Sequence, residues 1–157
     1  MTHARFWGGE GGAGGFTLVE LVVVLFLLSL MAGLVLPALG RGIEVVELRA
    51  QVAGLSAFLR YGREQAITKR LVHEIRIDRT AHRLTLIPAG AESPKAQRQL
   101  SSRIQFSADA PPSGVLTFSP EGFSSGASFR LEAPSGRAYR VTVDPFTGRV
   151  TNSPETG

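Results

Sequence analysis

The feature that most constrains this chain is an uncharged apolar segment near its N-terminus. Every residue from Leu21 to Gly40 is uncharged, and most of them are Leu or Val. A helix of this length is about 30 Å long, which matches the hydrocarbon thickness of a bilayer. A single domain of 157 residues does not usually enclose such a helix wholly in its own core. We therefore expect a membrane-spanning helix.

A secretory signal peptide is the first alternative to a retained helix. Its apolar region covers only about 7–15 residues and ends at a small-residue cleavage site. Here the apolar segment is longer, and Arg41 follows it without a clear A-x-A site. The residues before the segment carry Arg5 and Glu10 and are rich in glycine, so they lack a strongly basic head. The apolar segment is therefore expected to remain in the mature protein.

One acidic residue, Glu20, lies at the start of the apolar segment. A carboxylate near membrane depth is costly, by about 2.5–3.5 kcal/mol at a helix centre and less near an interface. In one interpretation Glu20 is hydrated at headgroup level, where an acid in the first turn suits the helix dipole. In the other it pairs with a cation in the same layer. No Lys or Arg lies between Arg5 and Arg41, so that cation would be a new amine at Phe16, created by cleavage after Gly15.

The segment GFTLVE, which begins at Gly15 and precedes the apolar helix, resembles the processing site of type IV pilins and type II secretion pseudopilins. The resemblance implies that the prepilin peptidase removes a leader of residues 1–15 by cutting between Gly15 and Phe16, and that Phe16 is N-methylated. It also implies that Glu20 neutralises the amine of a neighbouring subunit during filament assembly. Pro37 falls where the family often has a helix-bending proline, and a proline within a helix removes one hydrogen bond.

The pattern of the whole chain predicts an α+β fold. Its long helix has a first half that spans the membrane or packs in a filament core (16–40) and an amphipathic second half (41–70). Apolar residues recur there at three- and four-residue steps, on one helical stripe: Val45, Leu48, Val52, Leu55, Leu59 and Ala66. From 71 to 150 the apolar period becomes two, which predicts six or seven short antiparallel strands in a small sheet packed on the stripe. Residues 92–98 are expected to form a loop, and 151–157 a loose polar tail.

The C-terminal region resembles one subgroup of these pilin-like proteins. The stretch LTFSPEG, from Leu116, is followed by a Ser/Gly-rich turn and then by YRVTVDPFTGRV, from Tyr139. This order is similar to that of the GspH/FimT group of minor pseudopilins, although the segment DPFTG also has the composition of a plain tight turn. The resemblance implies a pilin-like fold, a single inner-membrane helix and a β-rich domain in the periplasm. It implies the prepilin peptidase, other major and minor pseudopilins and inner-membrane lipid as partners.

Composition and motifs give little support to catalysis. Without Cys, the chain has no disulfide, thiol nucleophile or Cys-bound zinc. His73-Glu74 is half of a zinc-protease motif, but Ile77 stands where the second His would be. His73 and His82 could face each other across a hairpin, but two such histidines are more often ordinary strand residues. We expect no catalytic residue, no metal and no cofactor.

Three interpretations of function remain. The first is a structural subunit of the type II secretion pseudopilus, involved in protein secretion across the outer membrane. The second is a minor type IV pilin of the FimT kind, involved in pilus biogenesis or DNA uptake, in which Arg137, Arg140 and Arg149 contact DNA. The third is an unrelated membrane-anchored enzyme. The net charge of +4 is scattered along the chain, which favours the first over the second, because DNA binding depends on many phosphate contacts to Lys and Arg.

Overall fold

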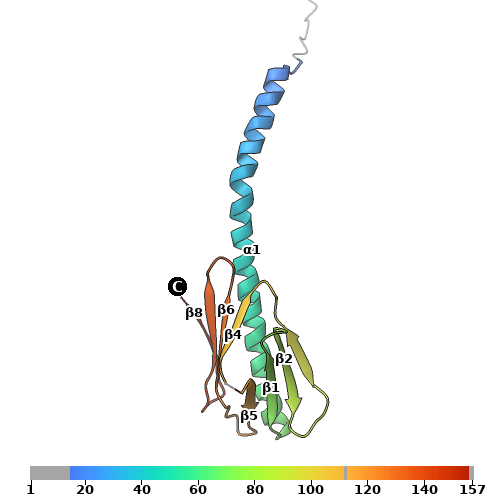
Figure 1. The fold of residues 1–157 in the computed structure, drawn as a ribbon, viewed down its shortest axis with the longest axis vertical. Coiled ribbons are helices and arrows are strands. Elements are labelled where there is room, and N and C mark those ends of the chain that lie inside the picture. Colours follow the sequence, from blue (N-terminus) through green and yellow to red (C-terminus); the bar gives the residue numbers. More distant parts are fainter. Residues whose placement is uncertain (1–14, 112, 156–157) are drawn as a thin grey trace, which may run out of the picture. The chain divides into compact units, whose positions relative to one another are not determined.

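The computed structural model of the chain describes residues 15–111 and 113–155, apart from the side chains of residues 34–42 and 110. One long helix, α1 (Leu18–Lys69), precedes all the strands (Figure 1). The strands are β1 (His73–Asp78), β2 (Arg83–Pro88), β3 (Ala96–Gln99), β4 (Gln105–Ala110), β5 (Val115–Phe118), β6 (Ala127–Glu132), β7 (Ala138–Val143) and β8 (Val150–Glu155). The chain divides into two compact units, Met1–Leu39 and Gly40–Gly157. The leader residues 1–14 lie outside the described residues.

Helix α1 begins with a cap formed by Thr17. The Thr17 hydroxyl accepts a hydrogen bond from the Glu20 amide at 3.2 Å, and the Thr17 carbonyl accepts one from the Leu21 amide at 3.1 Å. The first contact is one half of a capping box, in which a Ser or Thr side chain satisfies an amide that has no partner inside the helix. The helix expected from the sequence is confirmed, with bounds close to those predicted.

The helix ends in a left-handed residue that is not glycine. Arg70 has a φ of 51°. Its amide donates to the Ile67 carbonyl at 3.3 Å, and the Leu71 amide donates to the Ala66 carbonyl at 3.2 Å. These two bonds form a Schellman motif, in which glycine is the usual residue at the left-handed position.

In the second unit, α1 packs one face on the strands. The predicted stripe is buried apart from the partly exposed Val45, and its buried members are Leu48, Val52, Leu55, Leu59 and Ala66. They join one core cluster with inward-facing strand residues such as Phe118 and Phe129. Gly62 allows a close approach, because a Cβ there would lie 3.0 Å from Cδ1 of Ile75 in β1. The amphipathic half of the helix is therefore confirmed.

The strands form two sheets rather than the one small sheet expected. The first has the order β3-β2-β1-β5, and the second has the order β4-β6-β7-β8. All the pairings in both are antiparallel, as predicted. Figure 1 shows the two sheets side by side along the second half of α1. The α+β class is confirmed. Its division into two sheets was missed because a period of two identifies strands without saying which of them pair.

Two segments that the sequence predicts to be irregular are strands. β3 replaces the end of the expected loop over 92–98, and β8 replaces most of the expected tail over 151–157. Both are edge strands, paired only with β2 and β7 respectively, and the edge tolerates Pro154. Neither has an alternating apolar pattern, because most of their side chains are exposed or only partly buried. Ser56 of α1 also holds β8, because its hydroxyl donates to Asn152 Oδ1 at 2.7 Å. Residues 156–157 lie outside the described part.

Candidate functional site

The expected cleavage site precedes α1 and is exposed. The Phe16 side chain is 80% exposed. Nothing lies within 4 Å of the position that a Cβ on Gly15 would occupy. Both residues lie outside the helix, which begins at Leu18. The peptide bond between Gly15 and Phe16 is thus not shielded by the described part of the chain.

Glu20 lies in the first turn of α1 with an exposed side chain. Its amide is occupied by the Thr17 cap. Among the described residues, its carboxylate takes part in none of the side-chain hydrogen bonds or ion pairs. The positive end of the helix dipole favours negative charge at this position. Capping therefore accounts for the Glu20 amide and leaves the carboxylate available to a group from outside the chain.

The first half of α1 presents apolar side chains to its surroundings. Every large hydrophobic residue from Leu18 to Met31 is at least 42% exposed. The hydroxyl of Ser29 is satisfied within the helix, where it donates to the Leu25 carbonyl at 2.8 Å, as an apolar environment requires. An exposed apolar surface of this extent marks a site of interaction with protein or membrane.

Two predictions for the first half of α1, the membrane-spanning segment and the helix kink, involve residues whose side chains the structure does not describe. Within the residues that the structure describes, no helix combines the length and hydropathy needed to cross a membrane. The expected membrane segment includes residues 34–40, whose side chains lie outside the description. Pro37 is among them. The helix kink at this residue stays a prediction.

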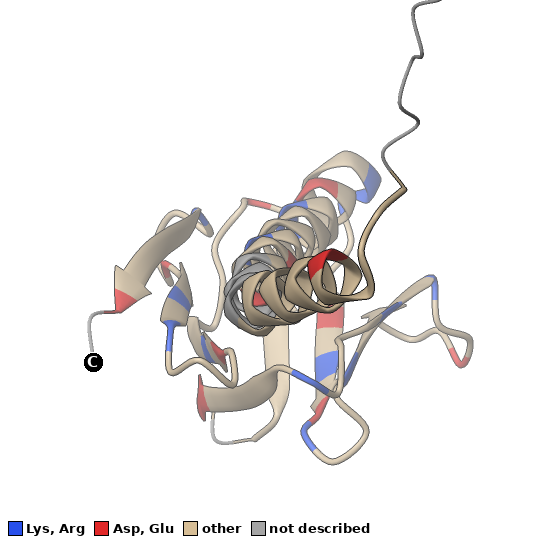
Figure 2. Cartoon of the chain, turned by 90° about the horizontal axis from the view of Figure 1, so that it is seen from above, with Lys and Arg blue, Asp and Glu red and all other residues tan. Residues whose placement is uncertain are grey.

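The three arginines proposed for DNA contact do not converge. Arg140 is paired with Glu155 and, from Nη1 to Oδ2 at 2.7 Å, with Asp109. The hydrogen bonds that Arg140 donates to Glu155 and Asp109 raise the pKa of its guanidinium. Arg137 and Arg149 lie at opposite ends of β7, a six-residue strand, which corresponds to a separation of about 20 Å. Figure 2 shows acidic and basic segments interspersed over the sheets.

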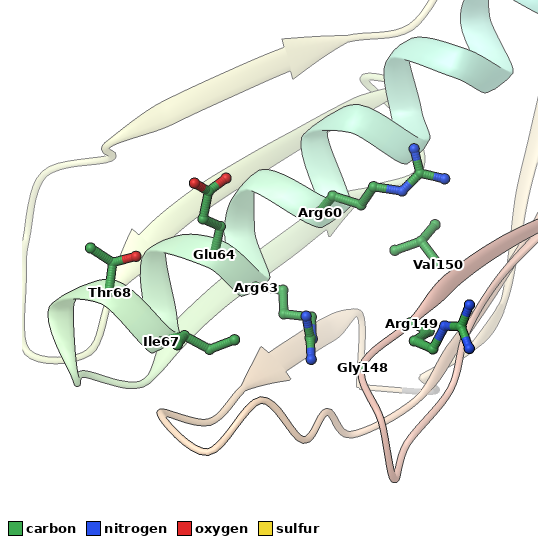
Figure 3. Close-up of a pocket in the computed structure, with 8 residues that line it drawn as sticks. All are labelled: Arg60, Arg63, Glu64, Ile67, Thr68, Gly148, Arg149 and Val150. Atoms are coloured by element: carbon green, nitrogen blue, oxygen red, sulfur yellow. The ribbon is translucent and has the colours of Figure 1, made fainter.

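A groove lies in the second unit, between the last turns of α1 and the turn before β8 (Figure 3). Its volume is ≈ 500 Å³, and its lining residues are Arg60, Arg63, Glu64, Ile67, Thr68, Gly148, Arg149 and Val150. Sequence reasoning singled out only Arg149 of these. Arg60 and Arg63 fall off the buried helical stripe, which is the one signal that could have marked them as surface residues available for binding.

Asp144 builds the turn that forms one wall of this groove. Its Oδ1 accepts hydrogen bonds from the amides of Phe146 at 3.0 Å and Thr147 at 2.7 Å, and from the Thr147 hydroxyl at 2.9 Å. The contacts with Thr147 are the main reason that the pKa of Asp144 lies below its usual value. The tight turn expected from the segment DPFTG is confirmed.

The two histidines do not form a metal site. His73 begins β1, where it pairs with Pro88, and His82 lies at the turn that joins the other ends of β1 and β2. The two histidines therefore do not face each other across the hairpin. His73 is buried, and its Nδ1 lies 2.9 Å from the Leu71 carbonyl. In the described part of the chain, no group of three or more His, Cys, Asp or Glu residues is arranged to hold a metal.

Comparisons with known proteins agree with one another. The family model described as Type II transport protein GspH matches residues 51–148. Type II secretion system protein H of Xanthomonas campestris pv. campestris is 30% identical over 148 residues, which cover 89% of this chain and 83% of that protein.

Solved structures show the same fold. The minor pseudopilin EpsH from the Type 2 Secretion System of Vibrio cholerae has a TM-score of 0.57 at 19% identity, over 69% of this chain and 97% of that one. The type IV minor pilin FimU of Pseudomonas aeruginosa has a TM-score of 0.57 at 20% identity, over 71% and 91%. Since the family match covers more than half of the sequence, the chain belongs to the GspH family and is a minor pseudopilin of the type II secretion system.

Proposed function

We propose that this minor pseudopilin is made as a precursor whose leader, residues 1–15, is removed by the prepilin peptidase. The enzyme cuts between Gly15 and Phe16, and the new N-terminus at Phe16 is methylated. The exposure of both residues ahead of the Thr17 cap supports this proposal. The chain is a substrate of that peptidase and acts by assembling with other pseudopilins, without a catalytic step of its own.

Before assembly, the first half of α1 lies in the lipid of the inner membrane, and the second unit lies in the periplasm. The exposed apolar side chains from Leu18 to Met31 support this, as does the uncharged sequence that continues to Gly40. During assembly the helix leaves the lipid and packs against the helices of neighbouring subunits in the periplasmic pseudopilus. Its apolar surface is then covered by protein instead of lipid.

Glu20 sets the axial position of the subunit by pairing with the methylated amine of Phe16 in a neighbour. The single observation that carries this role is the Glu20 carboxylate, which stays unpartnered within the described chain while the cap uses only the amide. In a water-poor filament core an unpaired carboxylate is unfavourable, and a nearby cation offsets much of that cost.

Intact mass measurement and N-terminal sequencing of the membrane-extracted protein from its native host test the processing step. We expect a chain that begins at methylated Phe16. A chain that still begins at Met1, in cells with an active prepilin peptidase, would remove the processing step and the partner amine of Glu20 with it.

The assembly role is tested with Glu20→Gln, which keeps the size of the side chain and the amide used by Thr17. Glu92→Gln, at an exposed loop position, is the matched control. We expect normal cleavage and folding for both variants, and incorporation into the pseudopilus reduced about 10-fold only for Glu20→Gln, as the loss of one charge-assisted contact predicts. Equal incorporation of the two variants would exclude Glu20 from assembly.

A further inference from the structure

The groove of Figure 3 carries positive charge that its own lining does not balance. Three arginines against one glutamate leave a net charge of +2. Arg60 and Arg149 are exposed and Arg63 is partly buried. Over the residues that the structure describes, none of the three arginines takes part in an ion pair. Figure 3 shows Glu64 directed away from the turn that carries Gly148. The groove is therefore an open cationic site.

Arg63 is held in place by two glycines from separate loops. Its Nε donates to the Gly122 carbonyl at 3.3 Å. A Cβ on Gly122 would lie 3.1 Å from Arg63 Nη2, and one on Gly148 would lie 2.8 Å from Arg63 Nε. The guanidinium is thus positioned before any ligand arrives, which lowers the side-chain entropy that binding must overcome.

Apolar groups accompany the cations. Ile67 and Val150 line the groove, and Ile67 is 40% exposed. The two loops that meet at Gly122 and Gly148 also carry Phe123 and Phe146, which are 54% and 79% exposed. Arginine and aromatic residues gathered around an apolar wall are typical of protein interfaces.

A protein segment fits this surface better than DNA does. Binding of a duplex depends on cations spread along several phosphates. Here Arg140 is already paired with acids, and Arg137 lies beyond the far end of β7, so neither adds a cation to the three of the groove. A short segment with one or two carboxylates and an apolar residue matches both parts of the groove.

We propose that this groove docks an acidic segment of a neighbouring pseudopilin, with an Asp or Glu carboxylate held by Arg60, Arg63 and Arg149. An apolar residue of the same segment contacts Ile67. The inference rests on the proposed function, because assembly into the pseudopilus is what brings the neighbour to the groove.

The test uses the full chain in its native host, with a photo-reactive benzoylphenylalanine in place of Phe146, in the turn that forms one wall of the groove. A second variant carries it in place of Phe26, which is 67% exposed on the first half of α1. Both replacements keep an aromatic side chain. We expect both variants to crosslink to pseudopilins, and the peptide captured at Phe146 to contain Asp or Glu.

Charge-reversal variants then test whether the arginines of the groove bind the acidic segment. In the Phe146 variant, Arg60→Glu or Arg149→Glu is expected to reduce the crosslink about 10-fold, the effect of one lost charge-assisted contact. Arg79→Glu, at an exposed position in the β1–β2 turn, is the control and is expected to leave it unchanged. Replacing the captured acid of the partner with Arg is expected to restore the crosslink to Arg149→Glu.

The two crosslinking positions separate this inference from the proposed function. Crosslinks at Phe26 without an Arg60- and Arg149-dependent crosslink at Phe146 would overturn the groove proposal. They would leave the proposed assembly role intact. Failure at both positions would overturn both proposals. Salt-sensitive binding of a DNA duplex by the purified full chain, lost in Arg149→Glu, would also overturn the groove proposal and favour the DNA-binding alternative.

Discussion

Gly148→Ala tests how the turn before β8 is built. Gly148 has a φ of 62°, in the left-handed region, and its amide donates to the Asp144 carbonyl at 2.8 Å. A Cβ at this position would overlap the carbonyl oxygen of Gly122 and lie 2.8 Å from Nε of Arg63. The Arg63 side chain can move aside, but the Gly122 carbonyl is backbone and can move only with its loop.

Two costs add in this variant. An L-residue in the left-handed region loses about 1–2 kcal/mol. Overlap with a backbone atom that must shift adds about 1–3 kcal/mol. We therefore expect the free energy of unfolding to fall by about 3 kcal/mol, which for a chain of this size lowers the melting temperature by about 6–12 °C.

The matched control is Gly136→Ala. Gly136 also has a positive φ, 80°, but nothing lies within 4 Å of its Cβ position. Thermal unfolding of the full chain in detergent, followed by far-ultraviolet circular dichroism, compares the two variants. In the control, the free energy of unfolding should fall only by the cost of the left-handed conformation, about 1–2 kcal/mol. Equal losses for Gly148→Ala and Gly136→Ala would refute the close approach of the two loops.

The same unfolding assay tests three further expectations. Arg70→Gly places glycine in the left-handed position that ends α1 and should raise the free energy of unfolding by about 1 kcal/mol. Leu59→Ala removes a fully buried side chain and should lower it by about 2–5 kcal/mol. Hydrogen bonds from Arg130 and then Arg140 hold the pKa of Glu155 below its usual 4.5. The stability that they provide is complete above pH 4.5 and is lost as the pH falls through the lower, folded-state pKa, so Glu155→Gln should show a smaller acid-induced decrease in melting temperature.

The helix and its buried face could be predicted because they depend on local pattern. The stripe that includes Leu48 and Leu59 repeats with the helical period, and its members are buried. The edge strands β3 and β8 could not be predicted this way, because most of their side chains are exposed or only partly buried and so show no apolar alternation. β8 depends on its register with β7 and on the Ser56–Asn152 contact, both of which come from tertiary structure.

The two candidate sites also differ in whether the sequence alone could reveal them. The segment from Gly15 to Glu20 is contiguous, so the sequence contains all of it. The groove joins Arg60 and Arg63 of α1 to Arg149, which follows them by more than half the length of the chain. No spacing rule links positions so far apart. Only the packing of the turn before β8 against the end of α1 brings these residues together.

On the proposed function, Glu20 has a more specific role than helix capping. A Thr cap followed by Glu at the third helical position commonly uses both side chains, but here only the Thr17 side chain makes its bond. The dipole of α1 stabilises the Glu20 charge only modestly, by about 0.3–1 kcal/mol at an exposed position. Removal from water in a filament core costs several kcal/mol per ion. The dipole cannot offset that cost, so on the proposed function the subunit is stable only in a position where a neighbouring amine meets Glu20. A single polar contact within an apolar interface then specifies the register, as a buried Asn does in a coiled coil.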